Sequence, residues 1–233
     1  MPTLDAHIVK ARRVLTVEVR LRLEQGERLA LFGASGAGKS TVLSCLAGIE
    51  IPDAGRVQFG DTVFFPPNLP LYQRSLAYLT QSDSLFPHLS VADNVCFGLR
   101  GRESNGASQW VEELRQRLEL GPLWHESARR ISGGQARRVA LARMLARRPP
   151  LVLLDEPFTA LDRPTIGDLV DAILQWHRAL GFTLIAVDHR ADILAKLCPR
   201  AIAIEDGRVV QAGAWSELTA APATPKLARL LSA

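Results

Sequence analysis

The sequence lacks several features that would place it in whole classes of protein. Its 233 residues contain no apolar run near the roughly eighteen residues of a membrane-spanning helix, and the first residues do not have the pattern of a secretory signal. Its three cysteines are odd in number and scattered, which argues against a disulfide framework or a zinc site. We therefore expect buried thiols and a cytosolic chain.

A strong excess of one charge is also missing. The formal net charge is +4, which is only mildly basic. Arginines recur between residues 137 and 148, and apolar residues at helical spacing interleave with them. Such a helix either has a solvated basic face or offers a surface to nucleic acid or acidic lipid. The apolar stripe favours the solvated face, so no nucleic-acid partner is expected.

A glycine-rich segment at residues 33–41 matches the phosphate-loop pattern G-x-x-x-x-G-K-[ST], with a predicted strand before it and a predicted helix after it. Its glycines allow backbone N–H groups to turn toward an anion, and the helix adds the positive end of its dipole. Lys39 is expected to reach the β- and γ-phosphates, and Ser40 to ligate Mg²⁺. The expected nucleotide-binding residues of this loop are Gly33, Ser35, Gly36, Ala37, Gly38, Lys39, Ser40 and Thr41.

Two carboxylates follow four apolar residues in the segment 151–157, the pattern of a Walker B strand. The apolar run predicts a central parallel strand, and its carboxyl end lies at the edge of the sheet where ligands bind. Asp155 is predicted to hold Mg²⁺, and Glu156 to orient or deprotonate the attacking water. A solvated turn is the alternative for an isolated Asp-Glu pair, but the order after a phosphate loop favours the catalytic reading.

Residues 131–135 read Ile-Ser-Gly-Gly-Gln, and with the two motifs above they make the chain resemble the ATP-binding subunits of ABC transporters, from about Val17 to about Gly213. The resemblance implies a head-to-tail homodimer, or a heterodimer with a related subunit. In it, this signature closes over ATP held by the partner's phosphate loop. Ser132 and Gly134 would donate hydrogen bonds to the γ-phosphate, aided by a helix beginning near Gln135. The signature residues expected to bind nucleotide are Ser132, Gly133, Gly134 and Gln135.

The resemblance assigns roles to further residues. Gln81 matches the Q-loop glutamine that senses Mg²⁺ and the γ-phosphate, and His189 matches the switch histidine. The run Ala160-Leu161-Asp162 matches the D-loop, and Asp162 is expected to take part in nucleotide binding across the dimer. The expected catalytic residues are thus Glu156, His189, Lys39 and Gln81, and the expected ligands of Mg²⁺ are Ser40, Gln81 and Asp155.

The implied fold class is α/β: a P-loop NTPase (RecA-like) core with a small antiparallel β-subdomain and an inserted α-helical subdomain, in a single ABC ATPase domain. Alternation over residues 17–23 and a hairpin turn at Gly60-Asp61 predict the β-subdomain. A predicted cap at Ser90 and an apolar stripe through Trp110 and Leu114 predict helices. The expected boundaries are 1–81 and 151–218 for the core, 82–150 for the helical part and 219–233 for a tail.

One family feature is missing. Family members usually carry an aromatic residue roughly twenty to twenty-five positions before the phosphate loop, where it stacks on adenine, and residues 8–13 contain none. Arg12 or Arg13 can stack a guanidinium plane on the base instead. The other reading is that both arginines are exposed charges at a strand edge.

The apolar cluster Leu85, Phe86 and Leu89 directly follows the Q-loop glutamine. It is either a docking groove for a partner helix or a piece of local core. The resemblance implies that the partners are transmembrane permease subunits, with a solute-binding protein as an indirect partner. The chain would then lie on the inner face of the cell membrane.

Residues 85–95 resemble importer subunits for molybdate, sulfate, iron or thiamine. The expected function is ATP hydrolysis that drives import of a small solute, with an oxyanion such as molybdate as the leading candidate. The alternatives are an exporter subunit, an ABC ATPase acting on nucleic acid, and a P-loop kinase or GTPase. A GTPase needs an Asn-Lys-x-Asp motif, which is absent, and a kinase has no use for the signature at residues 132–135.

Overall fold

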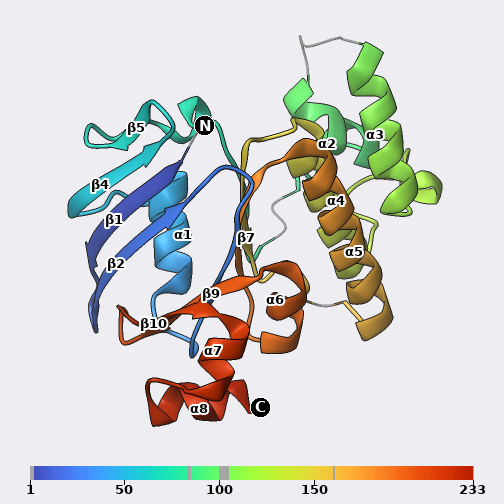
Figure 1. Ribbon diagram of the computed structural model, residues 1–233. Helices are drawn as coiled ribbons and strands as arrows, with labels where there is room; N and C mark the ends of the chain where they lie inside the picture. The colour runs from blue at the N-terminus through green and yellow to red at the C-terminus, as the bar shows by residue number, and fades with distance from the viewer. Residues whose placement is uncertain (1–2, 83–84, 100–104, 160, 233) are drawn as a thin grey trace. The chain divides into compact units, whose positions relative to one another are not determined.

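The computed structural model describes residues 3–82, 85–99, 105–159 and 161–232, and the chain forms two compact units (Figure 1). Unit 1 comprises Met1–Tyr78, Pro150–Glu156 and Gly181–Ala233. Unit 2 comprises Leu79–Pro149 and Pro157–Leu180. The chain therefore enters unit 2 twice, once after Tyr78 and once after Glu156.

The described strands form one ten-stranded sheet in the order β5-β4-β1-β2-β10-β9-β3-β8-β7-β6. Four neighbouring strands, β9, β3, β8 and β7, run parallel. β1 pairs antiparallel with β2 and β4, and β4 with β5 across the predicted hairpin. The strand bounds are β1 Leu4–Ala11, β2 Thr16–Leu23, β3 Arg28–Phe32, β4 Ala54–Phe59, β5 Thr62–Phe65, β6 Ala77–Leu79, β7 Leu151–Asp155, β8 Thr183–Val187, β9 Arg200–Glu205 and β10 Arg208–Ala214.

Burial along the strands follows their sequence patterns. Exposed and buried residues alternate strictly along β2, because only one of its faces packs on the core. Every residue of β7 and β8 is buried, as continuous apolar runs predict for parallel strands covered on both faces. The sequence thus indicates which strands are covered on both faces, although β7 lies next to the edge strand β6.

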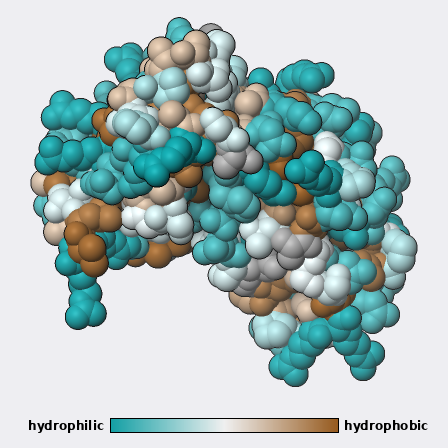
Figure 2. Space-filling view, turned by 90° about the horizontal axis from the view of Figure 1, so that it is seen from below, coloured by the Kyte–Doolittle hydropathy of each residue, from teal (hydrophilic) through white to brown (hydrophobic). Residues whose placement is uncertain are grey.

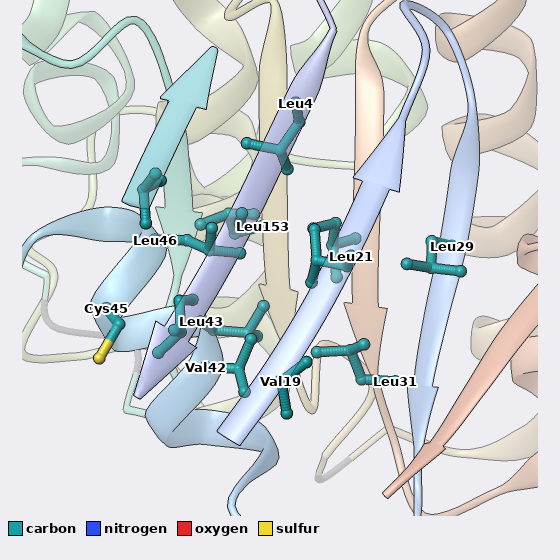
Figure 3. Close-up of a cluster of buried hydrophobic side chains, with 14 of the residues drawn as sticks. Leu4, Val19, Leu21, Leu29, Leu31, Val42, Leu43, Cys45, Leu46 and Leu153 are labelled. Carbon is teal, nitrogen blue, oxygen red and sulfur yellow. The ribbon is translucent and has the colours of Figure 1, made fainter. Parts of the chain in front are cut away.

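Helix α1 (Lys39–Ala47), which follows the phosphate loop, packs on this sheet. Figure 3 shows Val42, Leu43 and Leu46 of α1 facing side chains of the strands, among them Leu21 of β2 and Leu153 of β7. All five side chains are buried in one hydrophobic cluster. The start of α1, and with it the phosphate loop, is therefore fixed to the core of unit 1.

The other end of α1 is held by Arg74, a charged residue only 4% exposed. Its Nη1 donates to the carbonyl oxygens of Cys45 (3.0 Å) and Leu46 (2.6 Å) in the last turn of α1. Its Nη2 donates to the carbonyl of Phe64 (3.2 Å), and its guanidinium lies over the Phe64 ring. Burial lowers the pKa of this guanidinium, because it removes water from the charged group. The carbonyl oxygens that accept its hydrogen bonds replace part of the lost hydration. Arg74 thereby satisfies carbonyls that a helix end leaves without partners.

Unit 2 is built from helices. Ser90 caps α2 as predicted, since its Oγ accepts a hydrogen bond from the backbone N–H of Asp93 (3.0 Å). The apolar stripe predicted through Trp110 is also confirmed, because Trp110 and Leu114 are buried. The helices assigned wholly to unit 2 are α2 Val91–Cys96, α3 Asn105–Arg117, α4 Gly133–Ala146 and α5 Arg163–Leu180.

Three short helices complete unit 1: α6 Ala191–Leu197, α7 Trp215–Ala220 and α8 Pro225–Leu231. Within the described ranges, no helix combines the length and the apolar character needed to cross a membrane. Hydrophilic side chains cover most of the face shown in Figure 2.

Candidate active site

The parallel strands of unit 1 bring three sequence motifs to one edge of the sheet. Val187 of β8 lies level with Leu31 of β3 on one side and with Asp155 of β7 on the other. The phosphate loop, Glu156 and His189 follow these three strands in the chain. Because parallel strands end at the same edge, all three motifs lie at the carboxyl edge, where α/β sheets bind their ligands.

Two glycines of the phosphate loop are required by close packing. Gly33 has a φ of 151°, and a Cβ there would lie 2.2 Å from the backbone oxygen of Ile204 in β9. Gly38 caps α1 with a φ of 102°, and a Cβ there would lie 2.6 Å from Val17 Cγ2. Gly36 also has a positive φ of 77°, but no atom lies within 4 Å of a Cβ at that position. Close packing against the Ile204 backbone and the Val17 side chain therefore fixes both ends of the loop, while its tip is open.

Lys39 folds back into the loop. Its Nζ donates to the carbonyl oxygens of Gly33 and Ala34, each at 2.8 Å. Burial lowers the pKa of this ammonium, and the carboxylates of Glu156 and Asp155 act in the opposite direction. The predicted phosphate-binding cation therefore lies in the electrostatic field of the two predicted carboxylates.

Asp155 is held by two hydroxyl groups. Its side chain is 3% exposed; Ser40 Oγ donates to Oδ1 (3.1 Å) and the Tyr78 hydroxyl donates to Oδ2 (3.1 Å). Burial raises the pKa of Asp155, whereas the two hydrogen bonds lower it. Burial also raises the pKa of Tyr78, which keeps its hydroxyl a donor. The sequence predicted Ser40 and Asp155, but it gave Tyr78 no role, and its only signal was a hydroxyl within the apolar run 76–79.

Ser40 and Asp155 suit a magnesium ion. Mg²⁺ prefers oxygen ligands and is usually held by one or two carboxylates together with substrate phosphates. A hydroxyl and a carboxylate 3.1 Å apart beside a phosphate loop provide this donor set. In the part of the chain that the structure describes, no three His, Cys, Asp or Glu side chains gather into a metal-binding group.

Glu156 adopts a conformation that non-glycine residues rarely occupy. Its φ is 48°, and its backbone N–H donates to the carbonyl oxygen of Val187 (2.8 Å). Left-handed backbone at such a residue costs about 1–3 kcal/mol and is concentrated at functional sites. The bond to Val187 fixes the turn that carries this carboxylate beyond the end of β7.

His189 lies beyond the end of β8 with its side chain 69% exposed. Its Nδ1 is 3.4 Å from Oδ1 of Asp188, a carboxylate that is 1% exposed. The same oxygen accepts the backbone N–H of Arg190 (3.0 Å). Asp188 therefore anchors the turn that carries the imidazole. The sequence pointed to His189 but not to this buried neighbour.

Unit 2 carries the signature. Ser132 caps α4 in a reciprocal capping box: its Oγ accepts from the N–H of Gln135 (3.3 Å), and Gln135 Oε1 accepts from the N–H of Ser132 (2.8 Å). Because Ser132 supplies the cap, α4 begins at Gly133, earlier than the predicted start near Gln135.

The D-loop aspartate lies beside the signature. Ser132, Gly134, Gln135 and Asp162 line one open concavity of about 300 Å³ with Arg138, Leu161 and Thr165. Asp162 Oδ1 accepts the N–H of Thr165 (3.0 Å), and hydrogen bonding by the Thr165 side chain and backbone lowers the pKa of the carboxyl. The structure thus brings two predicted elements of unit 2 together, whereas Ala160 lies outside the described residues.

The remaining predicted residues divide between the units. Gln81 is exposed in unit 2, whereas the phosphate loop, Glu156 and His189 belong to unit 1. The predicted pairing of Gln81 with a metal at Ser40 and Asp155 stays a prediction. The Arg12 guanidinium bonds Thr41 Oγ1 (3.2 Å) and the carboxylate of Glu50, and its stacking on adenine stays a prediction.

Comparison with known proteins agrees with this geometry. The family model described as ABC transporter matches residues 17–159, which include the phosphate loop, Asp155, Glu156 and the signature. The chain belongs to the ABC transporter family. The resemblance inferred from the motifs is confirmed.

Several curated ABC relatives are similar along most of this chain. A molybdate/tungstate import ATP-binding protein of Thermococcus kodakarensis is 39% identical over 92% of the chain, and a sulfate/thiosulfate import ATP-binding protein of Agrobacterium fabrum is 38% identical over 92%. The chain spans 65% and 63% of their lengths. A thiamine import ATP-binding protein of Jannaschia sp. is 39% identical over 90% of the chain and is itself covered to 92%.

A solved structure extends the comparison to the fold. The crystal structure of a nucleotide-free ATP-binding cassette from an ABC transporter superposes with a TM-score of 0.82, at 22% identity, and covers 99% of this chain and 98% of its own. The predicted ABC-type α/β fold class is confirmed.

The two contrasting loop glycines yield a stability prediction. Gly33→Ala should lower the free energy of unfolding by about 2 kcal/mol or more, because its Cβ meets the Ile204 backbone oxygen and the φ is unfavourable. Gly36→Ala should cost about 1 kcal/mol, since only the φ is unfavourable there. Urea unfolding of the two variants measures both values. Equal losses would contradict the packing described for Gly33.

Proposed function

We propose that this chain is an ATP-hydrolysing subunit of an ABC importer, which drives a small solute through separate membrane subunits. The observation that carries the proposal is the cluster in unit 1: the phosphate loop with Lys39 at its centre, Ser40 bonded to the buried Asp155, and Glu156 at the same edge of the sheet. The relatives described above, all import ATP-binding proteins, support the direction of transport.

In this proposal the phosphate loop binds the triphosphate. Its backbone N–H groups and the start of α1 surround the phosphates, and the Lys39 ammonium leaves the carbonyls of Gly33 and Ala34 to pair with the β- and γ-phosphates. Ser40 and Asp155 would hold Mg²⁺, which supplies positive charge to the transferred phosphoryl group. Phosphoryl transfer depends mainly on positioning and charge, and these residues provide both.

Glu156 is the proposed base. Its strained turn, fixed by the bond to Val187, holds the carboxylate beyond the strand end, where it can orient a water in line with the γ-phosphate. His189 contacts the γ-phosphate from the neighbouring strand end, on the turn that Asp188 anchors. Gln81 is the proposed sensor that follows the nucleotide state.

A complete site needs a second chain. Each chain has one phosphate loop and one signature, and the signature lines its own concavity in unit 2 together with Asp162. We propose that Ser132, Gly133 and Gly134, at the start of α4, meet the γ-phosphate bound by the partner chain, where the helix dipole favours negative charge. Gln135 holds Ser132 in place through the capping box.

Arg12 is the proposed platform for the adenine base. Ser40, in the first turn of α1, is bonded to Asp155, whereas the neighbouring Thr41 is bonded to Arg12. Asp155 and Arg12 thus lie at different parts of the start of α1. We infer that a nucleotide with its γ-phosphate beside Asp155 has its nucleoside beside Arg12. The Thr41 hydroxyl and Glu50 hold the guanidinium, whose side chain remains 43% exposed and can stack on a base.

Permease docking is proposed at the surface of Leu85, Phe86 and Leu89. The Phe86 ring lies 4.3 Å from the Phe97 ring, and the Arg143 guanidinium lies 5.2 Å from the Phe86 ring centre. Asn94 pins the segment by accepting the Phe86 N–H (2.9 Å) and donating to its carbonyl (3.1 Å). Phe86 is thus partly local core, and Phe97, 42% exposed, extends the surface outward. This contact would hold the chain on the inner face of the membrane.

This surface is tested by isolating the chain with its permease from native membranes. Phe97→Asp should lower the yield of permease, because it removes an apolar ring that docking would bury and adds a carboxylate that docking would have to desolvate. Tyr72→Asp, at another exposed aromatic residue, should leave the yield unchanged. Unchanged recovery with Phe97→Asp would place the coupling surface elsewhere. The solute-binding protein recovered in the same preparation would show whether the cargo is an oxyanion such as molybdate, the class we favour.

The proposed base makes a sharp prediction. Glu156→Gln should lower kcat for ATP by about 10² to 10⁴, because the amide cannot accept the proton, while ATP binding persists. Steady-state hydrolysis and equilibrium ATP binding measure the two effects, and size-exclusion chromatography should find an ATP-bound dimer. Lys39→Ala is the control that loses binding as well. Wild-type turnover in Glu156→Gln would overturn the assignment.

The proposed stacking of Arg12 on the adenine base gives a second prediction. Arg12→Ala should raise the Kd for ATP about tenfold, because the stacking surface is lost, but leave the Kd for inorganic tripolyphosphate unchanged. Arg12→Trp should restore ATP binding, and Arg12→Lys should not. Arg13→Ala is the matched control at the adjacent arginine. Equal weakening for ATP and tripolyphosphate would show that Arg12 acts on the phosphates rather than on the base.

A further inference from the structure

Arg137 is a buried cation on the signature helix that the proposed mechanism does not use. It lies in α4, one turn beyond the capping residue Ser132, and is 2% exposed. Its Nε donates to the carbonyl oxygen of Pro157 (3.0 Å), and its Nη1 donates to the carbonyl oxygen of Thr80 (2.6 Å). All four residues belong to unit 2.

The two acceptors occupy particular places in the chain. Thr80 directly precedes Gln81, and Pro157 directly follows Glu156. The chain also enters unit 2 at these points, after Tyr78 and after Glu156. One guanidinium therefore joins the two entry segments, which are far apart in the sequence, to the helix that begins with the signature.

The chemistry of arginine suits this position. A guanidinium is planar and presents donors on different edges, so it can hold two backbone carbonyls at fixed separation and angle. A lysine ammonium is a single point of charge and does not impose this geometry. Burying the group costs desolvation that its hydrogen bonds must offset, so the contact is retained only in a closely defined arrangement.

We propose that Arg137 is a positioning residue that couples Gln81 and Glu156 to the signature helix. A displacement of α4, as a nucleotide contacts Ser132, is transmitted through the guanidinium to Thr80 and Pro157, and so to the residues beside them. Conversely, the entry segments set where the start of α4 lies. The proposal rests on the proposed function, since it concerns the same ATP-hydrolysing site.

The alternative is that Arg137 only stabilises unit 2. Trp110 provides the matched comparison: it is 4% exposed and its Nε1 donates to the carbonyl oxygen of Leu145 on the same helix (3.0 Å). Trp110→Phe removes a buried hydrogen bond to α4 without touching either entry segment. A purely structural role predicts that Arg137→Met and Trp110→Phe have similar effects at similar loss of stability.

The test measures kcat and KM for ATP in the full chain, together with hydrogen–deuterium exchange. Arg137→Met should lower kcat by about 10- to 100-fold, as small misplacements of reacting groups do, with KM within about twofold of wild type. Backbone exchange should accelerate at both entry segments, residues 79–82 and 157–159. Trp110→Phe should leave kcat within about twofold and both segments protected.

Several outcomes would overturn the proposal: wild-type kcat in folded Arg137→Met, a loss no larger than that of Trp110→Phe, or faster exchange at neither segment. If Arg137→Met does not fold, kcat and KM are measured for Arg137→Lys instead, because lysine keeps the charge but not the planar geometry of the guanidinium. We expect a lower kcat at unchanged KM, and an unchanged kcat contradicts the coupling. If the wild type does not hydrolyse ATP, the proposed function fails, and the exchange measurement still tests whether Arg137 holds both segments.

Discussion

The pairing of β8 between β3 and β7 is the constraint on which the site in unit 1 depends. Its register places Val187 level with Leu31 and Asp155, so the three following turns start from one edge of the sheet. The phosphate loop cannot move independently of this edge, because Gly33 packs on the backbone of Ile204 in the next strand. Backbone pairing therefore brings Lys39, Asp155 and Glu156 together, and contacts between their side chains are not needed for this.

Buried polar groups secure the points where this framework carries function. Asp155 is held by Ser40 and Tyr78 at the proposed metal site, and Arg74 secures the far end of the helix that starts at the phosphate loop. Asp188 fixes the turn of His189, and Arg137 joins the entry segments of unit 2. Unsatisfied buried polar groups cost about 1–3 kcal/mol each, so each of these bonds favours one arrangement of its loop.

Local sequence rules predicted the phosphate loop, the strand that ends at Asp155, the hairpin at Gly60-Asp61 and the cap at Ser90, because turn chemistry and hydrophobic periodicity act over a few residues. The bonds of Tyr78 to Asp155 and of Arg137 to Thr80 could not be predicted from the sequence, because they join residues distant in the chain and have no local sequence pattern. The positive φ of Glu156 could not be predicted either, because the bond that accompanies it joins Glu156 to Val187 on a neighbouring strand.

The central claim is that two chains each contribute half of an ATP site, with the phosphate loop of one facing the signature of the other. Ser35 in the phosphate loop and Ser132 in the signature are both exposed, one in each proposed half. The most direct measurement mixes differently tagged Glu156→Gln chains that carry either Ser35→Cys or Ser132→Cys, under mild oxidation. The account predicts a disulfide-linked pair of unlike chains that forms with ATP and not without it, and that is absent with only the native cysteines. Failure to cross-link with ATP bound, or full hydrolysis by a demonstrated monomer, would contradict it.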